Sequence, residues 1–402
     1  MYNSSKIVMN ILFITEWDAE NRKAGGVGRI TRQLSKSFRD VYGINCYMAY
    51  FKDLDACVES VFLDKIKLDA NNKDSDLKRF VLEKNINVII NQNSYRFISL
   101  DIVGVKSIFC IHSTPDYIIR SIDLCTLYHC GLHAESILFR FRFFVKMLFY
   151  PLYKGFVRQR VVRNYNEIVK NYTKIVLLSE KFIPVFANQV SFQLNKVLAI
   201  NNTLSYVLSR DAFLSQMKSK EKIVLVVARL EETSKRISCV LKIWKHIENN
   251  SVLDDWKLQI VGDGPDRRYY ERLAYDLNLQ RVIFAGEKDP TPFYQKASVF
   301  LMTSAFEGWP MSLTEAMQYG LVPLVYYTFL SLTDIVIDGV NGFIIKDNDE
   351  ACFCDKLIKI MQDKKKRETL ALNAATYIDK FSNSTISEKW YSLFLSLMKN
   401  DL

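Results

Sequence analysis

Short apolar runs alternate with longer amphipathic stretches along the chain. The runs that we predict as strands fall into two sets. The first comprises Ile7–Thr15, Asn45–Tyr50, Val88–Asn91, Ser107–His112 and Lys174–Ser179, and the second comprises Lys222–Ala228, Lys257–Val261, Arg281–Ala285, Val299–Met302 and Val322–Tyr326. Strands that alternate with helices predict parallel sheets with both faces covered, which is the α/β fold class.

The polar stretch Asn201–Lys220 interrupts this alternation near the middle of the chain. Each set of strands then occupies about 200 residues, which suits two doubly wound, Rossmann-like domains. Ligands of such sheets bind beyond the carboxyl ends of the strands. We therefore expect a ligand cleft between the facing loops of two domains.

Composition and charge narrow the class of protein. Of the 402 residues, 49% are apolar and 24% are charged, which excludes a disordered chain. The net charge of +10 favours anionic partners such as nucleotide sugars, acidic lipids or nucleic acid. The eight cysteines contain no CxxC pair, so neither a zinc ribbon nor a redox motif is indicated.

The sequence also carries expectations about location. The first residues run directly into a strand-like segment, and we expect no signal peptide. No apolar stretch is long enough to cross a bilayer. Reduced thiols in a cytoplasm fit this pattern best.

Two glutamates bracket the stretch EGWPMSLTEAM and form the most informative motif. Glu307 is predicted at a loop tip, and Glu315 near the first turn of a helix that begins around Met311 or Ser312. The free N–H groups of a first helical turn suit phosphate. Carboxylates on either side of an anion site suit the hydroxyls of a phosphorylated ligand such as a sugar nucleotide.

Basic and glycine residues follow other predicted strands. Arg229 and Lys235 follow the strand IVLVVA and can clamp a diphosphate, although a solvated loop explains them equally simply. The turn VGDGP at 261–265 is predicted to be structural. Gly25 and Gly26 follow the first strand and precede a helix, which suits either a tight turn or a ligand loop.

The histidines allow further hypotheses. His112 ends a strand, where it can hydrogen-bond a sugar or serve a structural role. His129, Cys130 and His133 lie within five residues but lack a fourth partner at a recognised spacing, so we expect no metal site.

Residues 137–163 contain seven basic residues interleaved with aromatic residues and no acidic residue. This pattern is typical of a segment that lies on an anionic membrane surface. The alternative is a buried helix pair with snorkelling basic side chains. Single-stranded nucleic acid is a weaker alternative for such a composition, and we expect no nucleic acid partner.

Together, these motifs resemble the retaining glycosyltransferases of family 4, which have the two-domain GT-B architecture. The resemblance covers nearly the whole chain and is strongest from Lys222 to Ile345. Its most specific piece is EGWPMSLTEAMQYGLVPLV followed by DIVIDGVNGFII, which is similar to the Glu-x7-Glu segment of the family and the sheet after it. VVARLEETSK and VGDGP are similar to its phosphate-binding and strand-end segments. The resemblance implies an N-terminal acceptor-side domain over 1–205, a nucleotide-sugar-binding domain over 206–378, and a final helix over 379–402 that crosses back.

The resemblance assigns roles to the motif residues. It implies that Glu307 contacts the donor sugar, that Glu315 binds the ribose, and that Arg229 and Lys235 neutralise the diphosphate. His112 matches the histidine near the donor sugar. The remaining donor-binding positions that it implies are Gly25, Gly26, Gly286, Lys288, Gly308, Met311, Ser312 and Leu313.

The function that this resemblance implies is transfer of a hexose or N-acetylhexosamine from a nucleoside-diphosphate sugar, with UDP favoured, to a glycan or lipid-linked glycan in surface polysaccharide biosynthesis. It implies retention of anomeric configuration and neither a cofactor nor an obligatory metal. A nucleotide-sugar epimerase and a non-catalytic sugar-binding or membrane-surface-binding protein are the alternatives. We expect a cytoplasmic protein in peripheral contact with the inner face of the cell membrane through residues 137–163.

Overall fold

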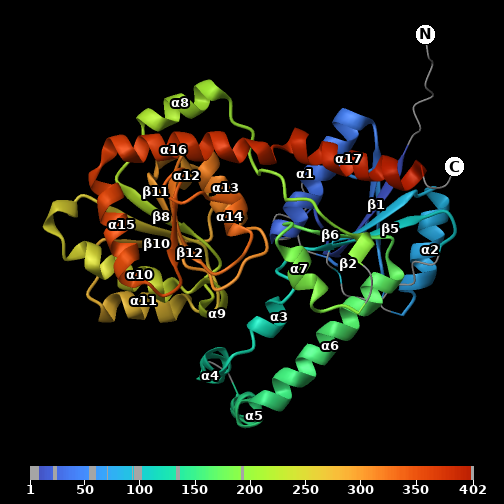
Figure 1. Ribbon diagram of the computed structural model, residues 1–402, viewed down its shortest axis with the longest axis horizontal. Coiled ribbons are helices and arrows are strands. Elements are labelled where there is room, and N and C mark those ends of the chain that lie inside the picture. The colour runs from blue at the N-terminus through green and yellow to red at the C-terminus, as the bar shows by residue number, and fades with distance from the viewer. Residues whose placement is uncertain are drawn as a thin grey trace. The chain divides into compact units, whose positions relative to one another are not determined.

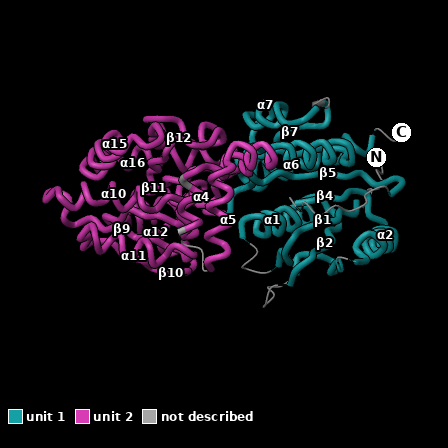
Figure 2. The backbone as a smooth tube through the Cα atoms, turned by 90° about the horizontal axis from the view of Figure 1, so that it is seen from below, with its two compact units in different colours: residues 1–116, 158–205, 381–402 teal, residues 117–157, 206–380 magenta. Residues whose placement is uncertain are grey.

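The computed structural model describes residues 9–20, 25–53, 60–69, 71–92, 94, 102–132, 136–191 and 194–399. Contacts divide the chain into two compact units (Figure 2). Unit 1 comprises residues 1–116, 158–205 and 381–402, and unit 2 comprises residues 117–157 and 206–380. Each unit contains one parallel sheet with flanking helices (Figure 1). The predicted α/β class with two Rossmann-like sheets is confirmed.

Unit 1 is built on a seven-stranded sheet with the order β3-β2-β1-β4-β5-β6-β7. Its strands are β1 (Asn10–Trp17), β2 (Asn45–Lys52), β3 (Asp64–Lys67), β4 (Val88–Gln92), β5 (Lys106–Ile111), β6 (Lys174–Leu177) and β7 (Val197–Ala199). Its helices are α1 (Gly25–Tyr42), α2 (Lys73–Glu83), most of α6 (Tyr150–Asn171), α7 (Phe182–Ala187) and α17 (Asn383–Lys399).

The core of unit 1 follows from the apolar runs of the central strands. Residues 11–14 of β1 and 88–90 of β4 are fully buried, because helices cover both faces of this part of the sheet. The C-terminal helix α17 packs on α1 through two aromatic pairs. The rings of Phe38 and Phe394 are 5.3 Å apart, and those of Tyr42 and Tyr391 are 4.2 Å apart. The last helix of the chain therefore completes the first unit.

Unit 2 is built on a six-stranded parallel sheet with the order β10-β9-β8-β11-β12-β13. Its strands are β8 (Ile223–Val227), β9 (Lys257–Val261), β10 (Val282–Gly286), β11 (Val299–Met302), β12 (Val322–Tyr327) and β13 (Phe343–Lys346). The helices before and within the first half of this sheet are α3 (Tyr117–Arg120), α4 (Leu124–Leu132), α5 (Ile137–Leu148), α8 (Arg210–Lys218), α9 (Glu232–Lys235), α10 (Ile237–Glu248), α11 (Arg267–Asp276) and α12 (Thr291–Lys296). The later helices are α13 (Met311–Gln318), α14 (Leu332–Ile335), α15 (Glu350–Gln362) and α16 (Lys364–Ile378).

Helix α10 shows how unit 2 is packed. Its apolar residues recur at helical spacing, and Val240, Leu241, Ile243, Trp244 and Ile247 are fully buried. They belong to a cluster that also contains the central strands and one face of α15. This core fixes the strand ends from which the candidate site is built.

Residues 117–157 group with unit 2, whereas the sequence boundaries put them in the first domain. The ring of Tyr117 packs edge-on against Phe306 at 4.7 Å. The guanidinium of Arg120 donates to the carbonyl of Thr328 at 2.9 Å. These contacts of α3 hold the segment on unit 2, and no periodic pattern in the sequence signals them.

Within the described part of the chain, no helix combines the length and the apolar character that a bilayer crossing requires.

Candidate functional site

Two loops of unit 2 meet at the carboxyl ends of the neighbouring strands β8 and β11. Lys235 ends α9, and Glu307 lies in the loop between β11 and α13. The Nζ of Lys235 lies 2.6 Å from Oε1 of Glu307, and their side chains are 24% and 14% exposed. A charge-assisted hydrogen bond of this length holds both side chains in place. The pair lies at the sheet edge where ligands of doubly wound folds bind.

Backbone contacts hold the two loops together. The N–H of Ala305 donates to the carbonyl of Ser234 at 2.8 Å. The hydroxyl of Thr303 lies 3.1 Å from the carbonyl of Lys235 and 2.9 Å from that of Arg236. Arg236 has a φ of 49°, a conformation that non-glycine residues rarely adopt and that these contacts maintain. The Lys235–Glu307 pair is therefore built on a fixed frame.

Arg236 is a residue of this frame that the sequence motifs did not single out. Its guanidinium donates to the carbonyl of Thr303 at 2.8 Å and to Asp347 at 2.7 Å. Its side chain is only 18% exposed. Arg236 therefore links the strand ends of β8, β11 and β13. The triplet Asp-Asn-Asp at 347–349 supplies this partner and also caps α15, since the carboxylate of Asp349 accepts from the N–H of Cys352.

Helix α13 begins at Met311, as the sequence predicts. Glu315 lies in its second turn and is only 2% exposed. The hydroxyl of Tyr294, from α12, donates to Oε2 of Glu315 at 3.0 Å. Tyr294 is fully buried. The carboxylate of Glu315 is therefore held by a core side chain that belongs to none of the sequence motifs.

Gly308, Ser312 and Leu313, which were also predicted to bind the donor, precede Glu315 in the same segment. The carbonyl of Gly308 accepts from the hydroxyl of Ser331 at 2.8 Å, which ties the loop to α14. Ser312 is half-buried and Leu313 is fully buried. Only the polar atoms and backbone of this turn can therefore face a ligand, while the side chain of Leu313 belongs to the core.

Arg229 does not join the Lys235–Glu307 pair. Its side chain is 68% exposed, and its Nε lies 4.0 Å from a carboxylate oxygen of Glu231. It follows β8 on the same loop as Lys235 but extends into solvent. The structure thus brings one of the two predicted cations together with Glu307, while the other is exposed beside Glu231.

The VGDGP turn has the structural role that the sequence predicts. A Cβ at Gly262, whose φ is +136°, lies only 1.9 Å from the carbonyl oxygen of Ala228. A Cβ at Gly264 lies 2.3 Å from the carbonyl oxygen of Leu230. Both glycines are therefore needed because the backbone of residues 228–230, which includes Arg229, lies directly against this turn.

Gly286 and Lys288, the remaining residues of unit 2 predicted to bind the donor, lie at the end of β10. Gly286 ends this strand with a φ of +75°, and its carbonyl accepts from the N–H of Gly262 at 2.8 Å. Lys288 is exposed two residues later. Among the described residues, no hydrogen bond joins either of them to the Lys235–Glu307 pair, and Gly286 contributes the turn that ends the strand.

Tyr117 and Arg120 of α3 are additional residues near the site that the motifs did not reveal. The ring of Tyr117 packs edge-on against Phe306, the neighbour of Glu307. Burial raises the pKa of Tyr117, and the negative charge of Glu231 adds to this effect, whereas Lys235 opposes it. The phenol therefore stays neutral at physiological pH and can act as a hydrogen-bond donor.

His112 belongs to unit 1 and follows β5 directly. Burial lowers its pKa to about 4, so the imidazole is neutral at physiological pH. Its Nε2 lies 2.6 Å from Oε1 of Gln92. Because that amide oxygen only accepts, we assign the proton to Nε2, which leaves Nδ1 as an acceptor. An acceptor nitrogen at a strand end suits a ligand hydroxyl.

Gly25 and Gly26 form the exposed start of α1 in unit 1. The sequence places these glycines before the helix, whereas the helix begins at Gly25 itself, which has a φ of +68°. A Cβ there meets no atom within 4 Å, so the conformation and not a steric conflict favours glycine.

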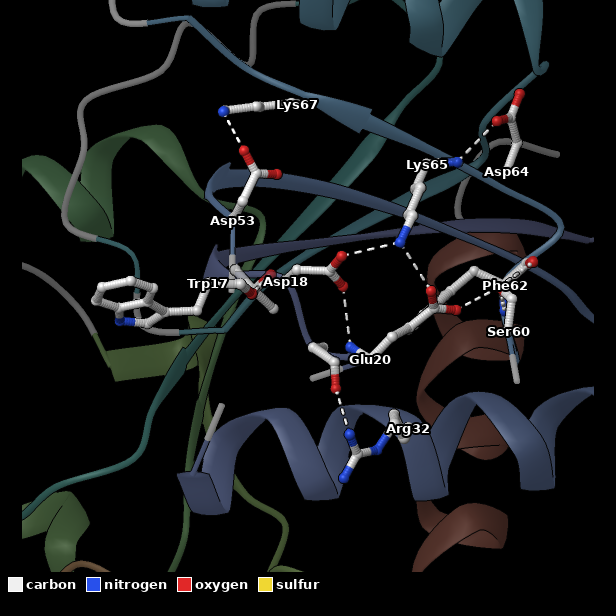
Figure 3. A network of polar contacts seen from close by, with 12 residues as sticks. Trp17, Asp18, Glu20, Arg32, Asp53, Ser60, Phe62, Asp64, Lys65 and Lys67 are labelled. Atoms are coloured by element: carbon white, nitrogen blue, oxygen red, sulfur yellow. Dashed lines mark hydrogen bonds and ion pairs between the residues drawn. The ribbon is translucent and has the colours of Figure 1, made fainter. Parts of the chain in front are cut away.

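A buried ionic network anchors the segment between β1 and α1 (Figure 3). The ammonium group of Lys65, from β3, lies 2.8 Å from Asp18 and 2.9 Å from Glu20. Both carboxylate side chains are under 10% exposed. The guanidinium of Arg32, from α1, donates to the carbonyl of Ala19 at 2.8 Å. This network fixes the chain where it leaves β1.

No described group of three or more histidine, cysteine or acidic residues has the arrangement of a metal site. Of the three residues considered as metal ligands, His129 lies 3.4 Å from Asp266 and His133 lies outside the described residues. The third is Cys130.

Part of the chain is similar to known proteins. Residues 210–377 match the family model described as Glycosyl transferases group 1. The amylovoran biosynthesis glycosyltransferase AmsD of Erwinia amylovora is 27% identical over 204 residues, which are 50% of this chain and 56% of that protein. The lipopolysaccharide 1,6-galactosyltransferase of Escherichia coli K12 is 27% identical over 205 residues, which are 49% of this chain and 55% of that protein. The chain thus spans little more than half the length of the curated relatives it matches.

A solved structure matches almost the whole chain in fold. HepE of Anabaena, determined in complex with UDP-glucose, superposes with a TM-score of 0.71 over 96% of this chain and 100% of that chain, at 15% identity. This likeness shows a common fold. Residues 210–377, which contain both the Lys235–Glu307 pair and α13, match the group 1 glycosyl transferases.

Proposed function

We propose that this protein is a retaining glycosyltransferase. It moves a hexose or N-acetylhexosamine from a UDP-sugar to a hydroxyl of a glycan or lipid-linked glycan in surface polysaccharide biosynthesis. The observation that carries the proposal is the Lys235–Glu307 pair, which lies beside the start of α13 inside the segment that matches the family. The names of the relatives support a polysaccharide acceptor, and the UDP-glucose complex of HepE supports a UDP-sugar donor.

The charges at the site suit departure of a nucleoside diphosphate. The bond between the anomeric carbon and the diphosphate oxygen breaks, and the electron pair leaves with the diphosphate. The ammonium of Lys235, the exposed guanidinium of Arg229 and the N–H groups at the start of α13 stabilise the growing negative charge. The acceptor oxygen bonds to the same face of the anomeric carbon, and its proton passes to the leaving diphosphate. Glu307 orients the sugar hydroxyls, and Glu315 the ribose.

Transfer assays with purified protein test the proposal. We expect transfer from a UDP-sugar to a glycan acceptor, with an α-linked product from an α-linked donor. Lys235→Ala and Glu307→Ala are each expected to lower kcat by at least about tenfold, as expected for loss of a transition-state contact. The control is Lys222→Ala, an exposed lysine before β8 whose ion pair is with Asp255.

Three outcomes contradict the proposal. Wild-type turnover by either site variant removes the assigned roles. Release of an epimerised sugar nucleotide from donor alone indicates an epimerase. Donor binding without turnover on any acceptor indicates a binding protein. EDTA is expected to leave the rate unchanged, since we propose no obligatory metal.

The donor nucleotide can be identified by its effect on stability. A ligand that binds only the folded state raises the melting temperature by mass action. We expect UDP and one UDP-sugar to raise it more than GDP, ADP or their sugars. Stabilisation by GDP-sugars alone contradicts the UDP assignment.

We also propose peripheral contact with an anionic membrane at the cytoplasmic face. Helix α5 has no buried residue, so the alternative of a buried helix pair is wrong for this element. The exposed apolar side chains of α5 and the start of α6 include Ile137, Leu138, Phe139, Phe141, Phe144, Leu148, Leu152 and Phe156. Basic residues interleave with them, and Lys146 lies 4.9 Å from the ring of Phe143. Aromatic rings beside cations suit the interface of an acidic bilayer.

Cosedimentation with vesicles that contain phosphatidylglycerol tests this contact. Replacing Arg140, Arg142 and Lys146 by glutamine is expected to weaken binding, most clearly at low salt. The control replaces three exposed lysines of unit 1, namely Lys36, Lys78 and Lys389. Equal binding by the two triple variants removes the membrane proposal.

A further inference from the structure

A cavity of about 660 Å³ lies at the opposite edge of the unit 2 sheet from the Lys235–Glu307 pair. Its lining includes Lys220, Ser298 and Gly320, which lie shortly before the first residues of β8 (Ile223), β11 (Val299) and β12 (Val322). In a parallel sheet the amino ends of the strands share one edge, so this cavity is separate from the strand-end loops described above. Its volume lies within the range of small-molecule sites.

One wall of the cavity is apolar. Phe213 and Met217 of α8 pack over Gly320, at the end of α13. A Cβ at Gly320, whose φ is +68°, lies 2.6 Å from Sδ of Met217 and 3.0 Å from the ring of Phe213. Leu372 of α16 lines the cavity and is 49% exposed. An apolar chain can therefore gain contact with α8 and α16 together.

The other wall is cationic. Four basic residues line the cavity, and its one acidic residue, Glu368, lies 3.8 Å from Lys364. Arg367 is held by hydrogen bonds to the carbonyls of Ile360 and Met361. The basic residues are Lys218, Lys220, Lys364 and Arg367.

Lys220 is the most unusual of these cations. Its Nζ donates to the carbonyl of Tyr294 at 2.7 Å, and no ion pair is found for it among the described residues. Burial lowers its pKa to about 7. A buried ammonium without a carboxylate destabilises the fold, and an incoming anion supplies the missing counter-charge.

We propose that this cavity binds an anionic amphiphile, a molecule with one phosphate or carboxylate group on an apolar chain. The anionic group pairs with Lys220, and the chain lies against Phe213, Met217 and Leu372. The two walls together favour a ligand with both an anionic group and an apolar chain. An inorganic anion leaves the apolar wall exposed to water, and a neutral chain leaves Lys220 without a counter-charge. The inference is independent of the proposed transfer reaction, because it uses residues at the other sheet edge.

Isothermal titration with monododecyl phosphate, below its micelle concentration and at pH 6.5, tests the proposal. We expect saturable binding of one equivalent by the full chain. Binding is expected to be stronger than for octyl phosphate, by about threefold per added methylene while the chain fits. Inorganic phosphate and dodecanol are expected to bind at least about tenfold more weakly, because each lacks one part.

Two variants make the test specific. Lys220→Met keeps an unbranched chain, removes the charge and is expected to weaken binding at least about tenfold. Lys365→Met makes the same change on α16 at an exposed lysine outside the cavity lining and is expected to bind like the wild type. Lys220→Met removes a destabilising charge, so we expect it to fold, which its melting temperature reports.

Four results overturn the proposal. They are absence of binding to the wild type, equal binding by Lys220→Met, equal affinity for inorganic phosphate, and displacement of the amphiphile by saturating UDP. The third indicates a plain anion site, and the fourth places the ligand at the donor site. If vesicles of the same phosphate lipid bind but the monomeric amphiphile does not, the contact is a membrane surface and not this cavity.

Discussion

Three ionisable residues show how local surroundings decide chemistry at the residue scale. His112 and Lys220 are both shifted toward their neutral forms by burial, with pKa values lowered to about 4 and about 7. Lys235 instead has a carboxylate partner, Glu307, at 2.6 Å. Lysine therefore has a different role at each edge of the unit 2 sheet: Lys235 pairs with a carboxylate, and among the described residues Lys220 does not.

The first residue-scale prediction concerns acid stability. Because His112 is neutral in the folded state, its contribution to stability is complete above its unfolded pKa of 6.5 and is lost as the pH falls toward 4. We expect an NMR titration of His112 to show a midpoint below 5. The variant His112→Gln should show a smaller loss of stability between pH 6.5 and 4. A midpoint near 6.5 contradicts the assigned burial.

The second residue-scale prediction concerns Lys220. Its lowered pKa makes its protonated form unfavourable in the folded state, so the destabilisation is complete below pH 7 and is relieved as the pH rises toward 10.5. We expect Lys220→Met to be more stable than the wild type at pH 6. Urea denaturation should show this difference shrinking between pH 7 and 10. A constant difference indicates that packing, not charge, is responsible.

At the scale of elements, short connections between strands hold the site residues. The β1–α1 segment is held by the ionic network of Lys65, and the β8–α10 segment by Thr303 and Arg236. In the first case the partner comes from β3, two strands away from β1, and in the second it follows β11, the neighbour of β8. A strand end with such partners keeps its loop in one conformation, as a binding site requires.

The network of Lys65 allows a matched comparison. Lys65→Met leaves the carboxylates of Asp18 and Glu20 buried without their cation, and we expect a loss of about 2 to 3 kcal/mol. Lys67→Met, on the same strand, removes an ion pair with Asp53 whose side chains are more than half exposed, and we expect a loss below about 1 kcal/mol. Denaturation in urea measures both, and equal losses contradict the role of the buried network.

The glycine turn after β9 allows a second element-scale prediction. Gly262→Ala places a Cβ against the carbonyl of Ala228 and requires alanine to adopt a positive φ. We therefore expect lower stability and weaker UDP binding. Gly155→Ala, on α6, meets no atom within 4 Å and is the control. Thermal denaturation with and without UDP measures both effects. Unchanged UDP binding in Gly262→Ala indicates that the turn does not support the donor site.

At the scale of the whole molecule, each unit is completed by a segment distant in sequence. Unit 1 includes α17 from the end of the chain, and unit 2 includes α3 to α5 from the first half. Helix α17 buries Ile386, Trp390 and Phe394 against unit 1. The two units are therefore interleaved along the chain, although each has its own sheet.

Truncation tests this dependence. Ending the chain after Lys380 removes α17 and exposes Phe38 and its neighbours, so we expect a loss on the order of 5 kcal/mol in the unfolding of unit 1. Removing residues 400–402 is the control. Calorimetry should show the transition of unit 1 lowered or lost. An unchanged melting profile contradicts the role of α17.

The strands that the sequence pattern did not predict have a common position. β3, β7 and β13 are edge strands of their sheets. β3 and β7 have no buried residue, and β13 has only four residues. Edge strands are covered incompletely, so they need no long apolar run and leave no strong signal. The central strands do need such runs, and the sequence predicted them.

The candidate site divides in the same way. Glu307, Glu315 and Lys235 were predicted from the sequence, because they follow predicted strands or lie near the start of a predicted helix. Tyr294, Arg236 and Tyr117 were not found, because their importance depends on contacts with Glu315, Asp347 and Phe306 that are remote in sequence.

The sequence by itself determined two parallel sheets, the order of their central strands along the chain, and the motif residues at the strand ends. These follow from local periodicity and composition, which the chain carries residue by residue. Only the tertiary structure decided that Lys235 pairs with Glu307, that Arg229 extends into solvent, that α17 completes unit 1, and that a cationic cavity forms around Lys220. Those outcomes depend on packing between segments that are distant in sequence, and a local sequence pattern carries no information about such contacts.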